Sequence, residues 1–312
     1  MPEDKIKIGI SACLLGEKVR YDGKHSLDHY LKYTLGRYIQ WIPVCPEVEC
    51  GLPVPREPMH LIGSPENPRL ITKYTGVDYT DLMNRWIKKK LRELQKEGLC
   101  GFVFKSRSPS SGLMKVKIKE PDGRVRMGRG LFARAFVERF PELPVEDDQR
   151  LQNPDLRKNF FLRVYVYKRW KELIKRNNKK TALVKFHERH KLILMAHSLQ
   201  RLREMETLLS STDLSHKKLI NKYFLLLMET LKLRSTMKKN YAVLQHILRH
   251  LRQALSIDET DELRESFEDY KRGRVPLIVP VTLINHYARK YNISYIEDQY
   301  YLRAFPENFT LD

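Results

Sequence analysis

Short apolar runs alternate with amphipathic stretches in the first half of the chain. The run Ile6–Ser11 is rich in β-branched residues and ends at small ones, which predicts a buried strand. Similar runs predict further strands at residues 41–44, 99–104 and 143–145. Between them, apolar residues recur at three- and four-residue steps, which predicts helices at residues 27–38, 79–97 and 130–140. Strands that alternate with helices indicate βαβ units, so we expect an α/β, Rossmann-like domain with a mostly parallel sheet.

The second half of the chain has a different pattern. Beyond the polar segment 146–149, the helical spacing of apolar residues continues almost to the C-terminus. It predicts helices at residues 154–175, 181–209, 215–233, 238–256, 258–271 and 276–291. We therefore expect two domains, an α/β domain over residues 1–148 and an all-α domain over residues 149–312. A chain of 312 residues is long enough for two cores.

The composition excludes several classes of protein. No apolar run approaches the roughly 18 residues that a membrane-spanning helix needs. The chain starts with charged residues of both signs and leads straight into a strand, so we expect no secretory leader, no membrane association and a cytoplasmic location. Four cysteines are too few for a disulfide scaffold of this size, and in a reducing compartment thiols are metal ligands, catalytic groups or core residues.

Positive charge is concentrated in the middle of the chain. The whole sequence has 58 Lys and Arg against 38 Asp and Glu, a net charge of +20, and residues 151–250 alone carry 23 against 7. Such clustering is typical of a polyanion partner, although a solvated basic helical surface would look the same. The densest run supplies the candidate RNA-binding residues, which are Lys168, Arg169, Lys175, Arg176, Lys179 and Lys180.

Four histidines in the helical half have spacings of three or four residues. His187 and His190 form one pair, and His246 and His250 form the other. Such pairs can bind metal ions, but histidines at helical spacing are more often packed in a core or directed at phosphates.

Three cysteines follow predicted strands. Cys13 comes after the first strand, and Cys45 and Cys50 come after the second. Because ligands of parallel sheets bind beyond the carboxyl ends of the strands, the three sulfurs could converge on one centre. Thiolates select zinc or iron–sulfur clusters, and structural zinc sites prefer closer pairs and four ligands. The spacing alone also allows reactive or core thiols, and Cys100, inside an apolar run, is predicted to be a core residue.

Polar segments accompany these cysteines. A turn with a cation, a ring and a carboxylate precedes residue 23, a segment with three prolines surrounds Arg56, and a loop with two cations and four hydroxyls covers residues 105–111. Such a loop can bind an anion or polarise a carbonyl, or it can be an ordinary Ser/Pro turn. The candidate substrate-binding residues are Ser11, Arg20, Tyr21, Asp22, Arg56, Lys105, Arg107, Ser110 and Ser111.

Several motifs, in this order, resemble those of the thiouracil and thiouridine desulfidases. They are Ser-Ala-Cys-Leu-Leu-Gly, Val-Arg-Tyr-Asp-Gly, Val-Cys-Pro-Glu, Gly-Leu-Pro-Val-Pro-Arg-Glu and the Ser-Pro-Ser loop, and they cover roughly residues 5–148. The second half resembles a stand-alone bacterial helical domain of the YbgA-like type, through segments at 186–191, 194–198, 244–246, 270–273 and 275–280. Fusions of the two resemble bacterial enzymes that remove sulfur from 4-thiouridine in transfer RNA.

The resemblance implies a 4Fe–4S cluster held by three cysteines, with a free iron that takes the thiocarbonyl sulfur. Carried over to this sequence, Glu47 is the general base that deprotonates the attacking water, and Ser108 hands on a proton or orients the pyrimidine. The iron acts as a Lewis acid, so the reaction is not redox. The expected substrate is thiolated tRNA. Free thiouracil as the substrate, and a non-catalytic nucleic-acid-binding protein with a structural metal, are the alternatives.

One position departs from the family pattern. The third cysteine of the family usually ends the Ser-Pro-Ser loop, and here that position is Ser111. We therefore expect Cys50 to supply the third sulfur beside Cys13 and Cys45. The alternative is a site with two thiolates that has lost its activity.

Overall fold

The computed structural model describes residues 5–176, 179–306 and 309. The start of the chain, on which the expectation of no secretory leader rests, lies outside them. The chain divides into two compact units, unit 1 up to Lys168 and unit 2 from Arg169 to Phe309. This division falls within helix α4 (Pro154–Arg176), later than the domain boundary expected after residue 148. The first turns of α4 belong to unit 1 because Phe160 and Val164 pack beside Gly101.

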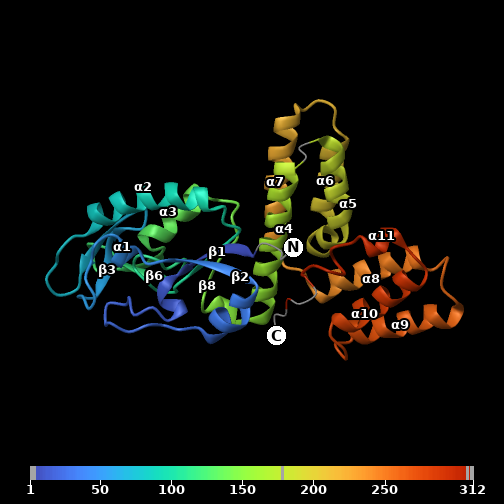
Figure 1. The fold of residues 1–312 in the computed structure, drawn as a ribbon, viewed down its shortest axis with the longest axis horizontal. Coiled ribbons are helices and arrows are strands. Elements are labelled where there is room, and N and C mark those ends of the chain that lie inside the picture. The colour runs from blue at the N-terminus through green and yellow to red at the C-terminus, as the bar shows by residue number, and fades with distance from the viewer. Residues whose placement is uncertain (1–4, 177–178, 307–308, 310–312) are drawn as a thin grey trace. The chain divides into compact units, whose positions relative to one another are not determined.

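Unit 1 contains a parallel sheet of four strands, which confirms the expected α/β class. The strand order is β2 (Ile39–Val44), β1 (Ile6–Ser11), β5 (Phe102–Phe104) and β8 (Val145–Asp147). Helices α2 (Thr80–Glu97) and α3 (Leu131–Arg139) lie together over the strands (Figure 1). Their apolar faces and the strands share one hydrophobic core.

The centre of this core explains a glycine in the first strand. Gly9 pairs with Ile42 on one side and with Phe102 on the other. A Cβ atom at Gly9 would lie 2.2 Å from the Phe102 ring, so only glycine fits there. Phe102 in turn stacks on Phe104, with ring centroids 4.3 Å apart. The close approach of ring and backbone therefore fixes how β1 and β5 lie side by side.

A second, mixed sheet was not predicted. Its order is β4 (Asn67–Thr72), β3 (Met59–Ser64), β6 (Val116–Lys119) and β7 (Val125–Gly128), with only β3 and β6 parallel. The helix expected at 27–38 is also different, because the chain forms a π-helical turn at Tyr30–Thr34 and a 3₁₀ turn at Leu35–Arg37. In unit 1 three further short helices were missed, η1 (Ala12–Leu15), α1 (Pro46–Glu49) and η4 (Arg150–Gln152).

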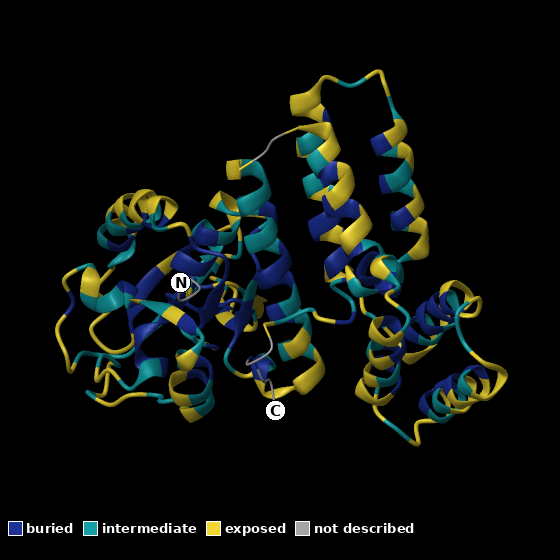
Figure 2. Ribbon diagram, turned by 45° about the vertical axis from the view of Figure 1, so that its right-hand side comes forward, coloured by how far each residue is buried: buried dark blue, intermediate teal, exposed yellow. Residues whose placement is uncertain are grey.

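Unit 2 is helical, as expected. Its helices are α5 (Lys180–His197), α6 (Leu199–Ser210), α7 (His216–Lys232), α8 (Met237–Leu251), α9 (Ile257–Lys271), α10 (Ile278–Lys290) and α11 (Ser294–Glu297). Figure 2 shows that several of them have one buried and one exposed face. The single helix expected at 181–209 is two helices, because Ser198 is extended and its hydroxyl caps α6 by accepting from Arg201 N. Among the described residues, no helix is both long and apolar enough to cross a membrane.

Two histidines of α5 are core residues. His187 and His190 are each only 1% exposed. The His187 Nδ1 lies 3.1 Å from the Tyr223 hydroxyl, and the His190 Nδ1 lies 2.7 Å from the Phe186 carbonyl oxygen. Burial lowers the pKa of His187 to about 4 and that of His190 to about 3. Both imidazoles are therefore neutral in the folded protein near neutral pH.

These two histidines should make unit 2 sensitive to acid. In the unfolded chain they bind protons below a pH of about 6.5, whereas in the folded chain they stay neutral to about pH 4 or lower. The unfolded state then binds more protons, so the free energy of unfolding should fall as pH drops from 6.5 toward 4, by about 1.4 kcal/mol per pH unit for each histidine.

Urea unfolding at pH 7.0 and pH 5.0 tests this, with Trp41 and Trp86 replaced by Phe so that Trp170 reports on unit 2 alone. The stability should be lower at pH 5.0, and the exposed His286→Gln variant should show the same difference. Equal stability at both pH values would contradict the assignment of His187 and His190 as buried neutral groups.

Candidate active site

A pocket of about 360 Å³ lies where the parallel strands of unit 1 end. All four strands of the sheet run the same way, so the segments that follow them meet at one edge. The pocket is lined by most of the residues that the sequence indicated, which are Ser11, Cys13, Arg20, Tyr21, Cys45, Glu47, Arg56, Lys105, Arg107, Ser108, Ser110 and Ser111. Asp22 and Cys50, which were also expected at the site, are not among the lining residues.

Two thiols line this pocket. Cys13 lies in η1, directly after β1, and is buried, while Cys45 caps the start of α1, directly after β2, and is partly buried. Burial raises the pKa of the Cys13 thiol to about 12 and that of the Cys45 thiol to about 11. The charge of Lys105 acts in the opposite direction on Cys13. Two soft donors therefore face the same space, with a cation beside them.

A carboxylate is fixed on the same wall by an ion pair. Glu47 follows β2 within α1, and its Oε2 binds the guanidinium of Arg56, with the Nε at 3.0 Å. Arg56 also donates to the carbonyl oxygens of Val19 (3.1 Å) and Pro53 (3.2 Å). The side chain of Arg56 is 6% exposed and that of Glu47 is 13% exposed. Arg56 thus links three segments of the pocket and holds Glu47 in one position.

The serines of the loop after β5 connect to this carboxylate. The Ser110 hydroxyl donates to Glu47 Oε1 at 2.7 Å and lies 3.0 Å from the Ser108 hydroxyl. Ser108 in turn accepts a hydrogen bond from the backbone N–H of Ser111 at 3.1 Å. The two residues expected to be catalytic, Glu47 and Ser108, are therefore joined through Ser110 in one row of hydrogen bonds.

A second ion pair anchors the start of this loop. Lys105 Nζ lies 2.5 Å from Asp148 Oδ2, and Asp148 Oδ1 accepts from the backbone N–H of Ser106 at 2.7 Å. The backbone N–H of Lys105 donates to the Ser11 hydroxyl at 2.8 Å. Sequence reasoning missed Asp148 because it treated residues 146–149 as a polar break between domains. Its place directly after the last strand of the sheet is the signal that could have found it.

The turn after η1 forms part of the rim. Arg20 donates to Asp22 (Nε–Oδ1 3.2 Å) and to the Ser26 hydroxyl (2.9 Å), and its guanidinium lies 5.5 Å from the centre of the Tyr21 ring. Asp22 thus orients Arg20 rather than lining the pocket. Tyr21 is 42% exposed, so a planar ring stands at the mouth.

The position of Cys50 differs from what we expected. Its thiol contacts the Glu47 carbonyl oxygen at 3.2 Å and packs against the hydrophobic core instead of lining the pocket. Cys45 and Cys50 flank α1 at its two ends. Each residue of a helix is rotated by about 100° from the one before it, so two side chains five residues apart point in directions that differ by roughly 140°. The fold therefore directs the thiol of Cys50 away from the pocket that holds Cys13 and Cys45.

Comparison with known proteins agrees with the motifs of the pocket. Residues 8–148 match the family model of 2-thiouracil desulfurase. The N-terminal half of the chain belongs to the 2-thiouracil desulfurase family. The resemblance found in the sequence is thereby confirmed. Residues 191–306 match a second family model, described as a protein of unknown function (DUF1722).

Three relatives cover different shares of the chain. The uncharacterized protein YbgA of Escherichia coli (strain K12) is 25% identical over 132 residues, which are 42% of this chain and 78% of that protein. The uncharacterized protein YbbK of Bacillus subtilis (strain 168) is 29% identical over 108 residues, 33% of this chain and 71% of that protein. The solved structure of the [4Fe-4S]-dependent thiouracil desulfidase TudS is 32% identical and covers 47% of this chain and 94% of its own, with a TM-score of 0.39.

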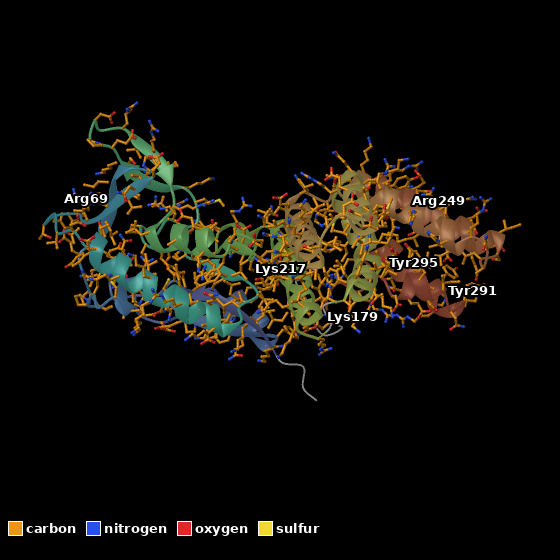
Figure 3. All side chains as sticks on the ribbon, turned by 90° about the horizontal axis from the view of Figure 1, so that it is seen from above. Arg69, Lys179, Lys217, Arg249, Tyr291 and Tyr295 are labelled. Atoms are coloured by element: carbon orange, nitrogen blue, oxygen red, sulfur yellow. The ribbon has the colours of Figure 1, made fainter. Side chains whose placement is uncertain are left out.

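The candidate RNA-binding residues lie outside the desulfurase-family domain, and they differ from one another in exposure. Lys175, Arg176, Lys179 and Lys180 are exposed at the end of α4 and the start of α5. Figure 3 shows Lys179 beside the ribbon of unit 2, together with Lys217 and Arg249 on other helices. Arg169 is instead part of the packing, because its guanidinium lies 3.7 Å from the centre of the Tyr300 ring and donates to the Ala304 carbonyl oxygen at 2.5 Å. Lys168 is partly buried.

The remaining histidine pair lies on α8. His246 and His250 face each other, with their Nε2 atoms 3.2 Å apart, and the His250 ring lies 4.8 Å from that of Tyr295. In the part of the chain that the structure describes, no three or more His, Cys, Asp or Glu side chains are arranged to hold a metal ion. This holds for the histidines of unit 2 and for the cysteines of the desulfurase-family domain alike.

The Glu47–Arg56 pair should contribute to stability as well as to chemistry. Glu47→Gln leaves the nearly buried guanidinium of Arg56 without its counter-charge, and removing one partner of such a pair costs about 3–5 kcal/mol. Because the pocket admits some water, we expect the free energy of unfolding of unit 1 to fall by about 3 kcal/mol.

Urea unfolding in a Trp170→Phe background, where Trp41 and Trp86 report on unit 1, measures this loss. The double variant Glu47→Gln/Arg56→Met should recover most of the stability, and Glu17→Gln, at an exposed position, should change little. A Glu47→Gln protein as stable as its parent would show that the ion pair contributes nothing to the fold.

Proposed function

We propose that the pocket of the desulfurase-family domain removes sulfur from a thiolated pyrimidine and replaces it with oxygen from water. In the balanced reaction the thiocarbonyl and water give a carbonyl and hydrogen sulfide, and no electrons are transferred. The observation that carries the proposal is that two thiols, Cys13 and Cys45, and the fixed carboxylate of Glu47 line one pocket. Soft sulfur donors suit a reaction in which sulfur must be bound, and a carboxylate suits the activation of water.

The donor set of the pocket fits an iron–sulfur cluster. Cys13 and Cys45 would hold it, beside the cations Lys105, Arg20 and Arg56, which are themselves paired with Asp148, Asp22 and Glu47. When bound, a 4Fe–4S cluster with one open iron supplies a Lewis acid that can take the sulfur of the substrate.

The protein's own residues handle the proton of the attacking water. Glu47 accepts it, because the carboxylate is held at one position by Arg56 and is joined to the pocket serines. Ser110 donates to Glu47 Oε1 and is bonded to Ser108, so a proton taken by Glu47 can reach Ser108 once both hydroxyls turn to donate in the opposite direction. Ser108 then donates it to the departing sulfur or to the ring of the pyrimidine.

Other lining residues would position the substrate. Tyr21, exposed at the mouth, offers a flat ring on which a pyrimidine can stack. Lys105 and Ser11, which the Asp148 anchor holds near Cys13, offer donors to a carbonyl oxygen of the base. Arg107 has a left-handed backbone conformation (φ 60°) within the same loop and lines the pocket as a second cation.

We further propose that the thiolated pyrimidine is 4-thiouridine within tRNA. The net charge of +20, its concentration in residues 151–250 and the exposed cations Lys175, Arg176, Lys179 and Lys180 support a polyanionic substrate. Phosphate contacts from such cations position a nucleic acid without reading its sequence and make binding salt-dependent. A base within folded RNA must also be unstacked to enter a pocket of this kind.

Turnover assays distinguish the substrates. The chain, reconstituted anaerobically with iron and sulfide, is given bulk thiolated tRNA, 4-thiouridine as nucleoside or free thiouracil, and the loss of the thiocarbonyl absorbance and the release of sulfide are measured. We expect the tRNA to be turned over with a lower KM than the nucleoside or the free base. Turnover of the free base alone would indicate a desulfidase of free thiouracil and not an enzyme that acts on RNA. Binding of tRNA without any turnover would indicate a nucleic-acid-binding protein.

The contribution of the exposed cations can be measured separately. Replacing Lys175, Arg176, Lys179 and Lys180 with Ala should reduce the slope of log K for tRNA against log salt by about 3, because each lost phosphate contact removes about 0.7–0.9. Turnover of the free nucleoside should stay the same. A matched control replaces four exposed cations of α2, which are Lys88, Lys89, Arg92 and Lys96. If both variants weaken tRNA binding equally, the effect is one of net charge and not of a binding segment.

A further inference from the structure

The pocket lacks a third cysteine. A four-iron cluster with one open iron requires three donors from the protein. Cys13 and Cys45 line the pocket, whereas Cys50 contacts the Glu47 carbonyl and the core. Over the described residues, no group of three Cys, His, Asp or Glu side chains is arranged to hold a metal ion. A third donor must therefore be a residue of another kind.

Ser111 is placed to be that donor. It ends the loop that follows β5, lines the pocket together with Cys13 and Cys45, and is only 3% exposed. Its backbone is held in place, since its own N–H donates to the Ser108 hydroxyl (3.1 Å) and the next N–H, of Gly112, donates to the Ser108 carbonyl (2.7 Å). A buried hydroxyl on a fixed backbone is preorganised for a ligand.

The hydrogen bonds of the loop single out this serine from its neighbours. The Ser110 hydroxyl is used by Glu47, and the Ser108 hydroxyl is used by Ser110 and by the N–H of Ser111. No hydrogen bond of the Ser111 hydroxyl is found with any described residue. The fourth hydroxyl of the loop, that of Ser106, accepts from Lys105 Nζ at 3.2 Å. The Ser111 hydroxyl alone is thus left facing the pocket that contains the thiols.

The loop around Ser111 is closely packed. A Cβ atom at Gly112 would lie 2.3 Å from Val116 Cγ2 and 2.6 Å from the Ser108 carbonyl oxygen. A Cβ atom at Gly130 would lie 2.5 Å from the Ser110 carbonyl oxygen. The backbone around Ser111 is therefore closely packed and held in one position.

We propose that the Ser111 oxygen is the third protein ligand of the cluster, so that the site is built from two thiolates and one alkoxide. The inference rests on the proposed function, in which Cys13 and Cys45 hold a 4Fe–4S cluster. As the iron–oxygen bond forms, the hydroxyl proton passes to solvent, as the thiol protons do, and no electron is transferred. Oxygen is a harder donor than sulfur, so iron at this corner is held less firmly than by a thiolate.

The test compares cluster content rather than activity. Full-length protein and the variants Ser111→Ala, Ser111→Cys and Cys50→Ser are reconstituted anaerobically with iron and sulfide. Iron and acid-labile sulfide per chain, the absorption at about 400 nm and the rate of iron loss to a chelator are then measured. Thermal unfolding of each protein before reconstitution shows whether the variant is folded.

We expect about four irons in the parent protein and in Cys50→Ser, and at most half as many in Ser111→Ala. Ser111→Cys should keep about four irons, absorb more strongly because a third thiolate contributes charge-transfer intensity, and lose iron to the chelator several-fold more slowly. This last variant shows that position 111 lies within bonding distance of the cluster, and the loss of iron in Ser111→Ala shows that the serine oxygen itself is used.

Other results would overturn the inference. If Cys50→Ser loses the cluster and Ser111→Ala keeps it, Cys50 is the third ligand. If both variants keep the iron content and spectrum of the parent, the third donor is not supplied by either residue. Failure of the proposed function looks different, because then the parent protein takes up no cluster, or Cys13→Ser and Cys45→Ser take up as much as the parent.

Discussion

The parallel alignment of β1, β2, β5 and β8 is the constraint on which the pocket depends. Segments that lie far apart in the sequence meet because all four strands end at the same edge of the sheet. The alignment depends on Gly9, the one residue type that leaves room for the Phe102 ring between the central strands. A change in the interior of the sheet would therefore move the thiols and the carboxylate relative to one another, although Gly9 touches neither.

Two ion pairs then give the pocket its shape. Arg56 ties Glu47 to the carbonyls of two other segments, and Asp148 ties Lys105 to the start of the serine loop. In both cases a charged side chain makes most of its hydrogen bonds with other residues of the protein. The polar groups of the pocket are thus in position before a substrate arrives, which is the arrangement that favours catalysis over mere binding.

The sequence was informative where strands and helices are strongly patterned, and it failed where structure is set by tertiary contacts. The α/β class, the helical second half and most residues of the pocket could be predicted, because strand ends carry the polar motifs. The second sheet was missed because runs such as Val116–Lys119 are short and half polar. Ser198 divides a helix by capping the next one, which periodicity does not reveal. The direction of the Cys50 side chain depends on the single helical turn of α1, and the spacing of the cysteines alone does not predict this turn.

The raised pKa values of the pocket thiols lower the reactivity of these side chains in the protein without iron. With a pKa of about 11, roughly one Cys45 side chain in ten thousand is a thiolate at pH 7, and for Cys13 the fraction is smaller still. Peroxides and alkylating agents attack thiolates, not thiols. Without a metal, the protein therefore carries these two sulfur atoms almost entirely as thiols, the less nucleophilic form.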